Sequence, residues 1–134
     1  MENILYTCVQ ILHNFGAVVV VGSPAAGWWL ERKNLMASRL ALFALLGWFI
    51  QGATGIGFAL TSYSLKGAVP EVTGVALAAL LVKIFGTVIG FTLAVLVRRK
   101  GSQWRLRSRI LAWQTMLTAS VAALVAAAFL RWYL

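Results

Sequence analysis

Two residues, His13 and Lys83, carry side chains that can ionise and yet lie inside long apolar runs of the sequence. An ionisable group at membrane depth costs about 2.5–3.5 kcal/mol or more, so it usually faces the interior of a helix bundle and marks a functional site. Neutral imidazole is the commonest metal ligand in proteins, and His13 is therefore a candidate ligand for haem iron or copper. Alternatively, His13 donates a hydrogen bond to a carbonyl of a neighbouring helix.

The charge of Lys83 has no carboxylate to balance it inside the apolar runs, because all three acidic residues of the chain lie at or beyond their ends. The lysine is therefore deprotonated, hydrated, or paired with an anionic group from outside the chain. A ligand carboxylate, a lipid phosphate or a partner subunit would supply such a group. Within the chain, the alternative partners of Lys83 are Gln51, Thr54 or a backbone carbonyl.

A helical rise of 1.5 Å per residue places His13 roughly 13 Å below the outer membrane surface, with Lys83 and Gln51 near the bilayer midplane. The glycine-rich segment 52–57 leaves room for a flat cofactor against the helix backbone. The candidate cofactor-binding residues are therefore His13, Gln51, Thr54, Gly55 and Lys83. Of these, only the histidine is a candidate metal ligand. We assign no catalytic residue, because the sequence shows no acid pair, no phosphate-binding loop and no nucleophile with a base at useful spacing.

The composition places these residues in a membrane. The chain has 134 residues, of which 61% are hydrophobic and 11% charged, whereas a water-soluble domain is about one quarter charged. Four apolar runs are long enough to cross a bilayer core about 30 Å thick, which takes about 20 helical residues. They cover residues 4–30, 38–65, 70–97 and 109–133. We therefore expect an all-α membrane protein, a single domain over residues 1–134 that forms an antiparallel bundle of four transmembrane helices.

The distribution of charge predicts how the bundle is oriented. The formal net charge is +9, and the basic residues gather between the apolar runs, in loops 31–37 and 98–108. Lys and Arg accumulate in cytoplasmic loops, so we expect both of these loops to be cytoplasmic and both termini to lie outside. The expected location is the bacterial inner membrane, and binding to nucleic acid is excluded. Trp104 and Trp113, near the start of the last run, are expected at the membrane interface.

Three short motifs resemble a known family. Segment 12–22 reads Leu-His-Asn-Phe-Gly followed by small and branched residues, a Thr54-Gly55 pair lies in the second run, and Lys83 lies within the apolar segment 80–85 of the third. This pattern resembles the copper resistance protein D family and the related bacterial four-helix membrane protoporphyrinogen oxidases. Two features depart from it. Val21 replaces a tryptophan that commonly precedes the glycine of the first helix, and the chain has no second histidine.

The resemblance implies a fold that binds haem b or copper, and two functions follow as expectations. In the first, the chain is a redox-associated, electron-transfer protein that holds haem or porphyrin between its first three helices. His13 is then the axial ligand, and Lys83 meets a propionate or assists proton movement. In the alternative, the chain is a non-catalytic accessory subunit that contacts lipid, partner helices or further copies of itself. Transport of a solute or metal is less favoured, because four helices enclose little space without oligomerisation.

Overall fold

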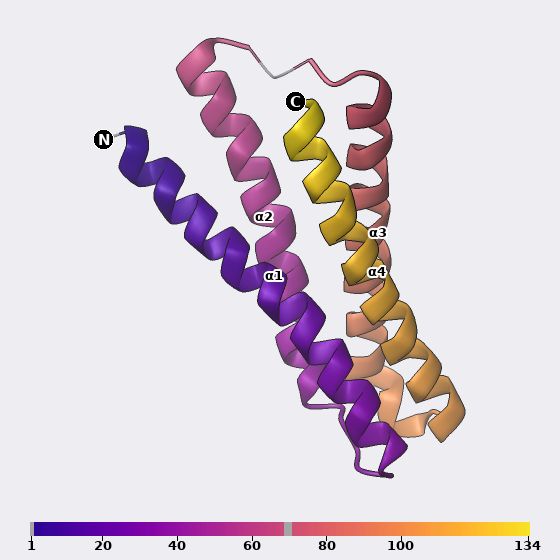
Figure 1. Ribbon diagram of the computed structural model, residues 1–134. Helices are drawn as coiled ribbons and strands as arrows, with labels where there is room; N and C mark the ends of the chain where they lie inside the picture. The colour runs from indigo at the N-terminus through magenta and orange to yellow at the C-terminus, as the bar shows by residue number, and fades with distance from the viewer. Residues whose placement is uncertain (1, 69–70) are drawn as a thin grey trace.

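The computed structural model describes residues 2–68 and 71–134, with the side chains of residues 2 and 3 left out. Within these ranges the chain folds into four α-helices and one short 3-10 helix, with no strand. The elements are α1 (Glu2–Arg32), α2 (Leu40–Lys66), α3 (Gly74–Lys100), η1 (Gly101–Gln103) and α4 (Leu106–Tyr133) (Figure 1). All four α-helices are long and apolar enough to cross a membrane. The predicted all-α class and four-helix bundle are thus confirmed.

The helix boundaries differ from the predicted runs by a few residues. The second helix begins at Leu40 rather than at residue 38, because residues 38 and 39 form a turn. The predicted start of the third helix, Pro70, lies outside the described residues, and α3 begins at Gly74. Two ends extend into the predicted loop 98–108: α3 continues to Lys100, and α4 begins at Leu106. The basic side chains in the last turn of α3 stabilise this end of the helix, because their positive charge is attracted to the negative end of the helix dipole.

Glycines in left-handed conformations end α2 and begin α3. Gly67 has a φ of 69°, and its N–H donates to the carbonyl of Tyr63, which closes the last turn of α2. Gly74 has a φ of 59° at the first position of α3. Glycine adopts such angles at low steric cost. These two glycines thus allow α2 to end and α3 to begin near the predicted break between the second and third apolar runs.

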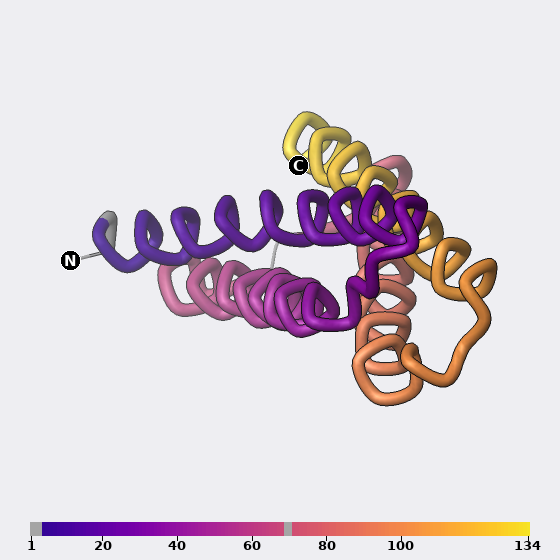
Figure 2. Tube along the Cα trace, turned by 90° about the horizontal axis from the view of Figure 1, so that it is seen from below, coloured from indigo at the N-terminus to yellow at the C-terminus, as the bar shows by residue number. Residues whose placement is uncertain are grey.

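The helices form two hairpins, α1–α2 and α3–α4. The N-terminal end of α1, the C-terminal end of α4 and the α2–α3 connection lie at one end of the bundle, which we call the open end (Figure 1). The α1–α2 and α3–α4 loops lie at the opposite end, which we call the loop end. The hairpins converge at the loop end and lean apart toward the open end (Figures 1 and 2).

Two tryptophans fill glycine notches in the core. Trp113 is fully buried against Gly27, where an added Cβ would lie 2.5 Å from the indole ring. Trp48 is 1% exposed and lies against Gly90, where an added Cβ would approach the ring to 2.1 Å. The indole of Trp113 therefore packs inward onto α1 and does not face the lipid. Within the described residues, neither indole N–H has a hydrogen-bond partner, so both rings contribute through packing.

A buried ion pair joins the two hairpins at the loop end. The Glu31 carboxylate is 1% exposed, and its Oε2 accepts a hydrogen bond of 3.0 Å from Arg109 Nε. Arg109 Nη1 also donates to the carbonyl of Trp104 at 2.7 Å. The second carboxylate oxygen of Glu31 accepts from the backbone N–H of Ala37 at 3.3 Å. Glu31 thereby connects the end of α1 to the start of α4 and to the α1–α2 loop.

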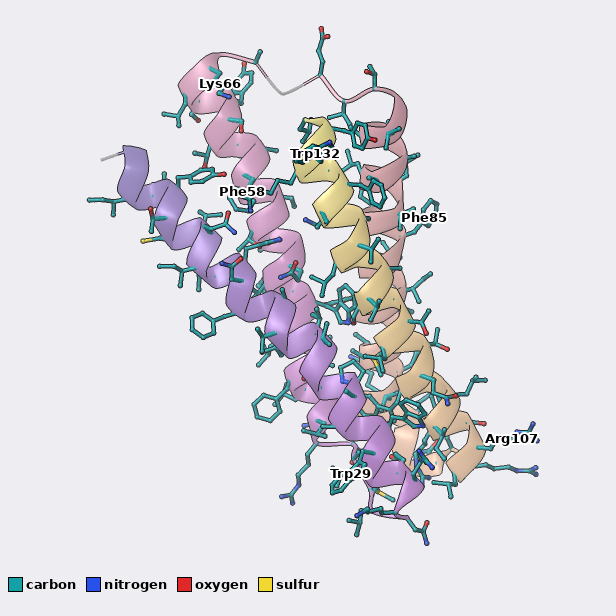
Figure 3. The ribbon with its side chains drawn as sticks, viewed as in Figure 1. Trp29, Phe58, Lys66, Phe85, Arg107 and Trp132 are labelled. Atoms are coloured by element: carbon teal, nitrogen blue, oxygen red, sulfur yellow. The ribbon has the colours of Figure 1, made fainter. Side chains whose placement is uncertain are left out.

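Large apolar side chains cover the outside of the bundle, and they contact lipid. Leucine, isoleucine, valine and phenylalanine side chains are exposed on all four helices. Trp29 and Arg107 mark the loop end, while Lys66 and Trp132 mark the open end (Figure 3). Lys33 Nζ lies 4.1 Å from the centroid of the Trp29 ring, as expected for a cation over an interfacial aromatic residue. The chain is a multi-pass membrane protein.

Candidate functional site

The two ionisable residues of the apolar runs meet inside the bundle. Lys83 Nζ on α3 lies 3.5 Å from His13 Nε2 on α1, although the residues are 70 positions apart in the chain. Both side chains are partly buried. The sequence-based alternatives for Lys83 were Gln51, Thr54 or a backbone carbonyl, and the structure brings it to the imidazole instead. The direct contact was not foreseen, because it depends on how α1 and α3 are rotated and tilted against each other.

The other ring nitrogen of His13 contacts α2. His13 Nδ1 lies 2.6 Å from Thr54 Oγ1, and the Thr54 hydroxyl is also 2.6 Å from the carbonyl oxygen of Ile50. Thr54 is 7% exposed, so these contacts are shielded from solvent and lipid. The imidazole is therefore held between a hydroxyl group of α2 and an amine of α3.

Gln51 fixes the backbone on which the histidine stands. Its Nε2 donates to the carbonyl oxygen of His13 at 2.6 Å, and the side chain is 7% exposed. Gly16 makes this approach possible, because a Cβ there would lie 2.9 Å from Gln51 Nε2 and 2.9 Å from a methyl group of Ile50. Hence α1 and α2 pack closely beside the site. We call His13, Gln51, Thr54 and Lys83 the His13 cluster.

An aromatic side chain that sequence reasoning missed covers the cluster toward the open end. The Phe58 ring meets the imidazole of His13 edge to face, with centroids 5.4 Å apart and planes at 75°. The Tyr6 ring also packs against Phe58, with centroids 5.4 Å apart. Figure 3 shows Phe58 between α1 and α2. One signal was available, since Phe58 follows Thr54 by four positions and so lies on the same helix face.

The remaining predicted site residue, Gly55, follows the cluster on α2 but faces open space. A Cβ at Gly55 would meet nothing within 4 Å, and one at Gly52 would meet only a Thr87 methyl group at 3.9 Å. The Thr87 hydroxyl is itself occupied, because it donates to the carbonyl of Lys83 at 2.9 Å. A strip of bare backbone therefore runs along α2 beside Thr54.

The donor set limits which metals the chain can hold alone. No group of three or more His, Cys, Asp or Glu residues comes together among the described residues. Surface grooves of about 420 Å³ between α3 and α4, and about 690 Å³ between α1 and α2, lie apart from the cluster and include none of its residues. The chain thus offers one imidazole nitrogen, one amine and a glycine strip.

Four of the five predicted site residues therefore come together from three helices, and the fifth lies beside them. No protein-family model, curated protein or solved structure matches the chain. The assignment of a function rests on the geometry of the His13 cluster.

Proposed function

We propose that the protein binds a haem or a related porphyrin within the membrane, with His13 as the ligand of the iron and Lys83 as the partner of a porphyrin carboxylate. The observation that carries this proposal is the 3.5 Å contact between His13 and Lys83. The motifs that carry the family resemblance lie on α1, α2 and α3, and their polar residues converge at one place. Two ionisable groups placed at random on separate spanning helices would not be expected to lie in contact.

The imidazole fits the role of a haem ligand. A ligating histidine typically has its other ring nitrogen hydrogen-bonded to the protein, which orients the ring, and Thr54 contacts Nδ1 of His13 in this way. On the other side, Lys83 approaches Nε2 only at the long limit of hydrogen bonding, so a stronger ligand can displace it. When bound, haem supplies one-electron redox chemistry.

Haem suits this donor set better than copper does. A single protein histidine holds haem iron in globins and peroxidases, because the porphyrin supplies the other four nitrogens. Copper has no macrocycle to supply ligands, and electron-transfer copper sites use two histidines and a cysteine of the protein. Apart from His13, the cluster contains no histidine, cysteine or carboxylate. A copper site would therefore need ligands from a second chain.

Lys83 and the glycine strip fit the other parts of a porphyrin. A carboxylate of the macrocycle would give Lys83 the counter-charge that the chain does not provide within the spans, and such a pair is strong at low dielectric. Gly52 and Gly55 leave the backbone of α2 open to a flat ring, because an added Cβ at either position would stand almost free of neighbours. These features support the assignment of Gly55 and Lys83 to the same binding site.

We further propose an orientation in the membrane, from the positions of the basic loops. The basic loops 31–37 and 98–108 both lie at the loop end (Figure 1). We place that end in the cytoplasm, and both termini outside, because Lys and Arg accumulate on the cytoplasmic side. For a bacterial inner membrane, the His13 cluster then lies in the half of the bundle nearer the periplasm.

Absorbance of the protein purified in mild detergent tests the proposal. Cells supplied with haem precursors should yield a protein with a Soret band, and His13→Ala should lose it. Asn14→Ala is the matched control, because Asn14 adjoins His13 but is exposed and bonds only to Gln10 among the contacts of its side chain. A wild-type protein that stays colourless after haem is supplied would contradict the proposal.

An accessory subunit of a larger membrane complex is the second candidate, and one observation favours it. The groove between α3 and α4 is lined only by apolar side chains, four of them alanines. Small residues at membrane depth let another helix approach closely. A colourless protein that co-purifies with a partner, and loses it when Ala78 or Ala122 is enlarged to leucine, would support this candidate.

A further inference from the structure

The hydroxyl of Thr54 carries one proton, and the geometry indicates where it goes. Thr54 Oγ1 lies 2.6 Å from the carbonyl oxygen of Ile50 and 2.6 Å from His13 Nδ1. A carbonyl oxygen only accepts, so the contact with Ile50 is a hydrogen bond only if the hydroxyl donates to it. The oxygen of Thr54 is then left to accept, and the short contact with His13 is satisfied when Nδ1 carries the proton of the neutral ring.

We infer that Thr54 is a positioning residue that holds His13 as the tautomer with its proton on Nδ1 and a free lone pair on Nε2. The contact with Lys83 then has a defined direction, because Nε2 without a proton can only accept, and the amine of Lys83 therefore donates. Lys83, His13, Thr54 and the carbonyl of Ile50 thereby form a chain of hydrogen bonds that all point the same way. Bonds aligned in this manner polarise and strengthen one another.

Packing keeps the ring in the orientation that this chain of hydrogen bonds requires. A half-turn of the imidazole would place a carbon atom against the Thr54 hydroxyl and end the 2.6 Å contact. The edge-to-face contact with Phe58 restricts the ring from one side. Gln51 holds the backbone of His13 in place through its carbonyl. Thr54 therefore acts through His13 and has no need to touch a ligand itself.

The significance of this tautomer for a ligand rests on the proposed function. A metal bound to His13 would be bound through Nε2, the nitrogen that faces α3. Loss of an outer partner of a ligating histidine typically weakens metal binding 10- to 100-fold. Thr54→Val keeps the shape of the side chain but removes the acceptor, so it should weaken haemin binding about 10- to 100-fold. Thr54→Ser keeps the acceptor and should retain the affinity for haemin.

The tautomer can be measured directly, because the chain contains one histidine. The full chain, labelled with nitrogen-15 histidine and reconstituted free of porphyrin in lipid nanodiscs, gives a spectrum of a single imidazole ring. We expect the proton on Nδ1. The Lys83→Met variant removes the amine that faces Nε2 and should leave the proton on Nδ1, since Thr54 alone holds it there.

Two further variants in the Lys83→Met background isolate the effect of Thr54. The Lys83→Met/Thr54→Val double variant should have the proton on Nε2, at least in part. The Lys83→Met/Thr54→Ser double variant should keep it on Nδ1. A wild-type ring protonated on Nε2 would overturn the inference, and so would a valine variant whose tautomer matches that of its serine counterpart. The wild-type spectrum alone decides the matter if a double variant does not fold. A protein that binds no haemin but is protonated on Nδ1 would refute the proposed function and support the role of Thr54.

Discussion

At the level of single residues, polar side chains inside the apolar helices contact other polar groups instead of remaining unpaired. His13, Gln51 and Thr54 satisfy each other or a backbone carbonyl through contacts of 2.6 Å. At the loop end, Glu31 and Arg109 neutralise each other in a buried position. Lys83 is the exception, since among the described residues its side-chain amine makes one polar contact, the long one to His13. The weakest contact of the cluster is thus the one that a ligand would replace.

Breaking the Glu31–Arg109 pair should destabilise the protein strongly. Removal of one partner of a buried pair typically costs 3–5 kcal/mol, because it leaves an uncompensated charge. We expect Glu31→Ala to lower the free energy of unfolding by about 3 kcal/mol, since Arg109 retains its bond to the Trp104 carbonyl. Reversible unfolding in mixed micelles measures this difference.

Arg107 supplies the control for that experiment. It lies on the first turns of α4 like Arg109, but it is exposed and has no acidic partner among the described residues. Arg107→Ala should change the free energy of unfolding by less than about 0.5 kcal/mol. Equal effects of Glu31→Ala and Arg107→Ala would show that the ion pair does not hold the hairpins together.

Much of the site was predictable at this scale, and the reason is physical. An ionisable side chain is too costly in lipid to be placed at random, so His13 and Lys83 could be recognised from their positions in apolar runs. Their direct contact could not be predicted, because it depends on how α1 and α3 are rotated and tilted. Glu31 was read as part of a basic loop, and its burial depends on Arg109 from the other hairpin.

At the level of helices, packing relies on glycine notches that accept tryptophan rings. These contacts join α1 to α4 through Gly27 and Trp113, and α2 to α3 through Gly90 and Trp48. The lengths and number of helices follow from hydropathy, which is why the four runs were predicted closely. The inward face of each helix did not follow, because apolar residues occur on all sides of a helix that contacts lipid. The burial of Trp113 was not predicted for this reason.

Gly90→Ala tests the notch directly. A methyl group would lie 2.1 Å from the Trp48 ring, and neither a backbone position nor a buried indole can move away freely. Overpacking of this kind typically costs 1–3 kcal/mol, and we expect a loss of about 2 kcal/mol in the free energy of unfolding. Thermal unfolding in detergent, followed by circular dichroism, measures the change.

Gly22 provides a matched glycine in the same kind of helix. A Cβ there would meet nothing within 4 Å, so Gly22→Ala should leave stability unchanged or raise it by about 0.5–1 kcal/mol. If both alanine variants raised stability, the packing of the Trp48 ring would not require a glycine at position 90.

At the level of the whole molecule, the two hairpins pack closely at the loop end and diverge at the open end. The tryptophan notches and the Glu31–Arg109 pair lie toward the loop end, whereas the hairpins lean apart toward the open end (Figure 1). The His13 cluster lies between these two regions. The proposed ligand-binding site therefore lies between a closely packed end of the bundle and an end at which the hairpins lean apart.

The proposed orientation predicts which end of the bundle faces the cytoplasm. In a Cys8→Ser background, Ser102→Cys in η1 should react with a membrane-impermeant maleimide only after cells are permeabilised. Lys66→Cys at the open end should react in intact spheroplasts. Both positions are exposed. The reverse pattern of labelling would place the loop end outside and contradict the assigned sidedness.

The most direct test of the central claim is titration of the purified, porphyrin-free chain with haemin and, separately, with metal-free protoporphyrin. If His13 binds the iron and Lys83 binds a carboxylate, His13→Ala should lose most of its affinity for haemin but keep that for the metal-free ring. Lys83→Met should weaken binding of both about tenfold or more, which corresponds to about 1.4 kcal/mol. Binding of haemin that is unchanged in both variants, or absent in the wild type, would contradict the account.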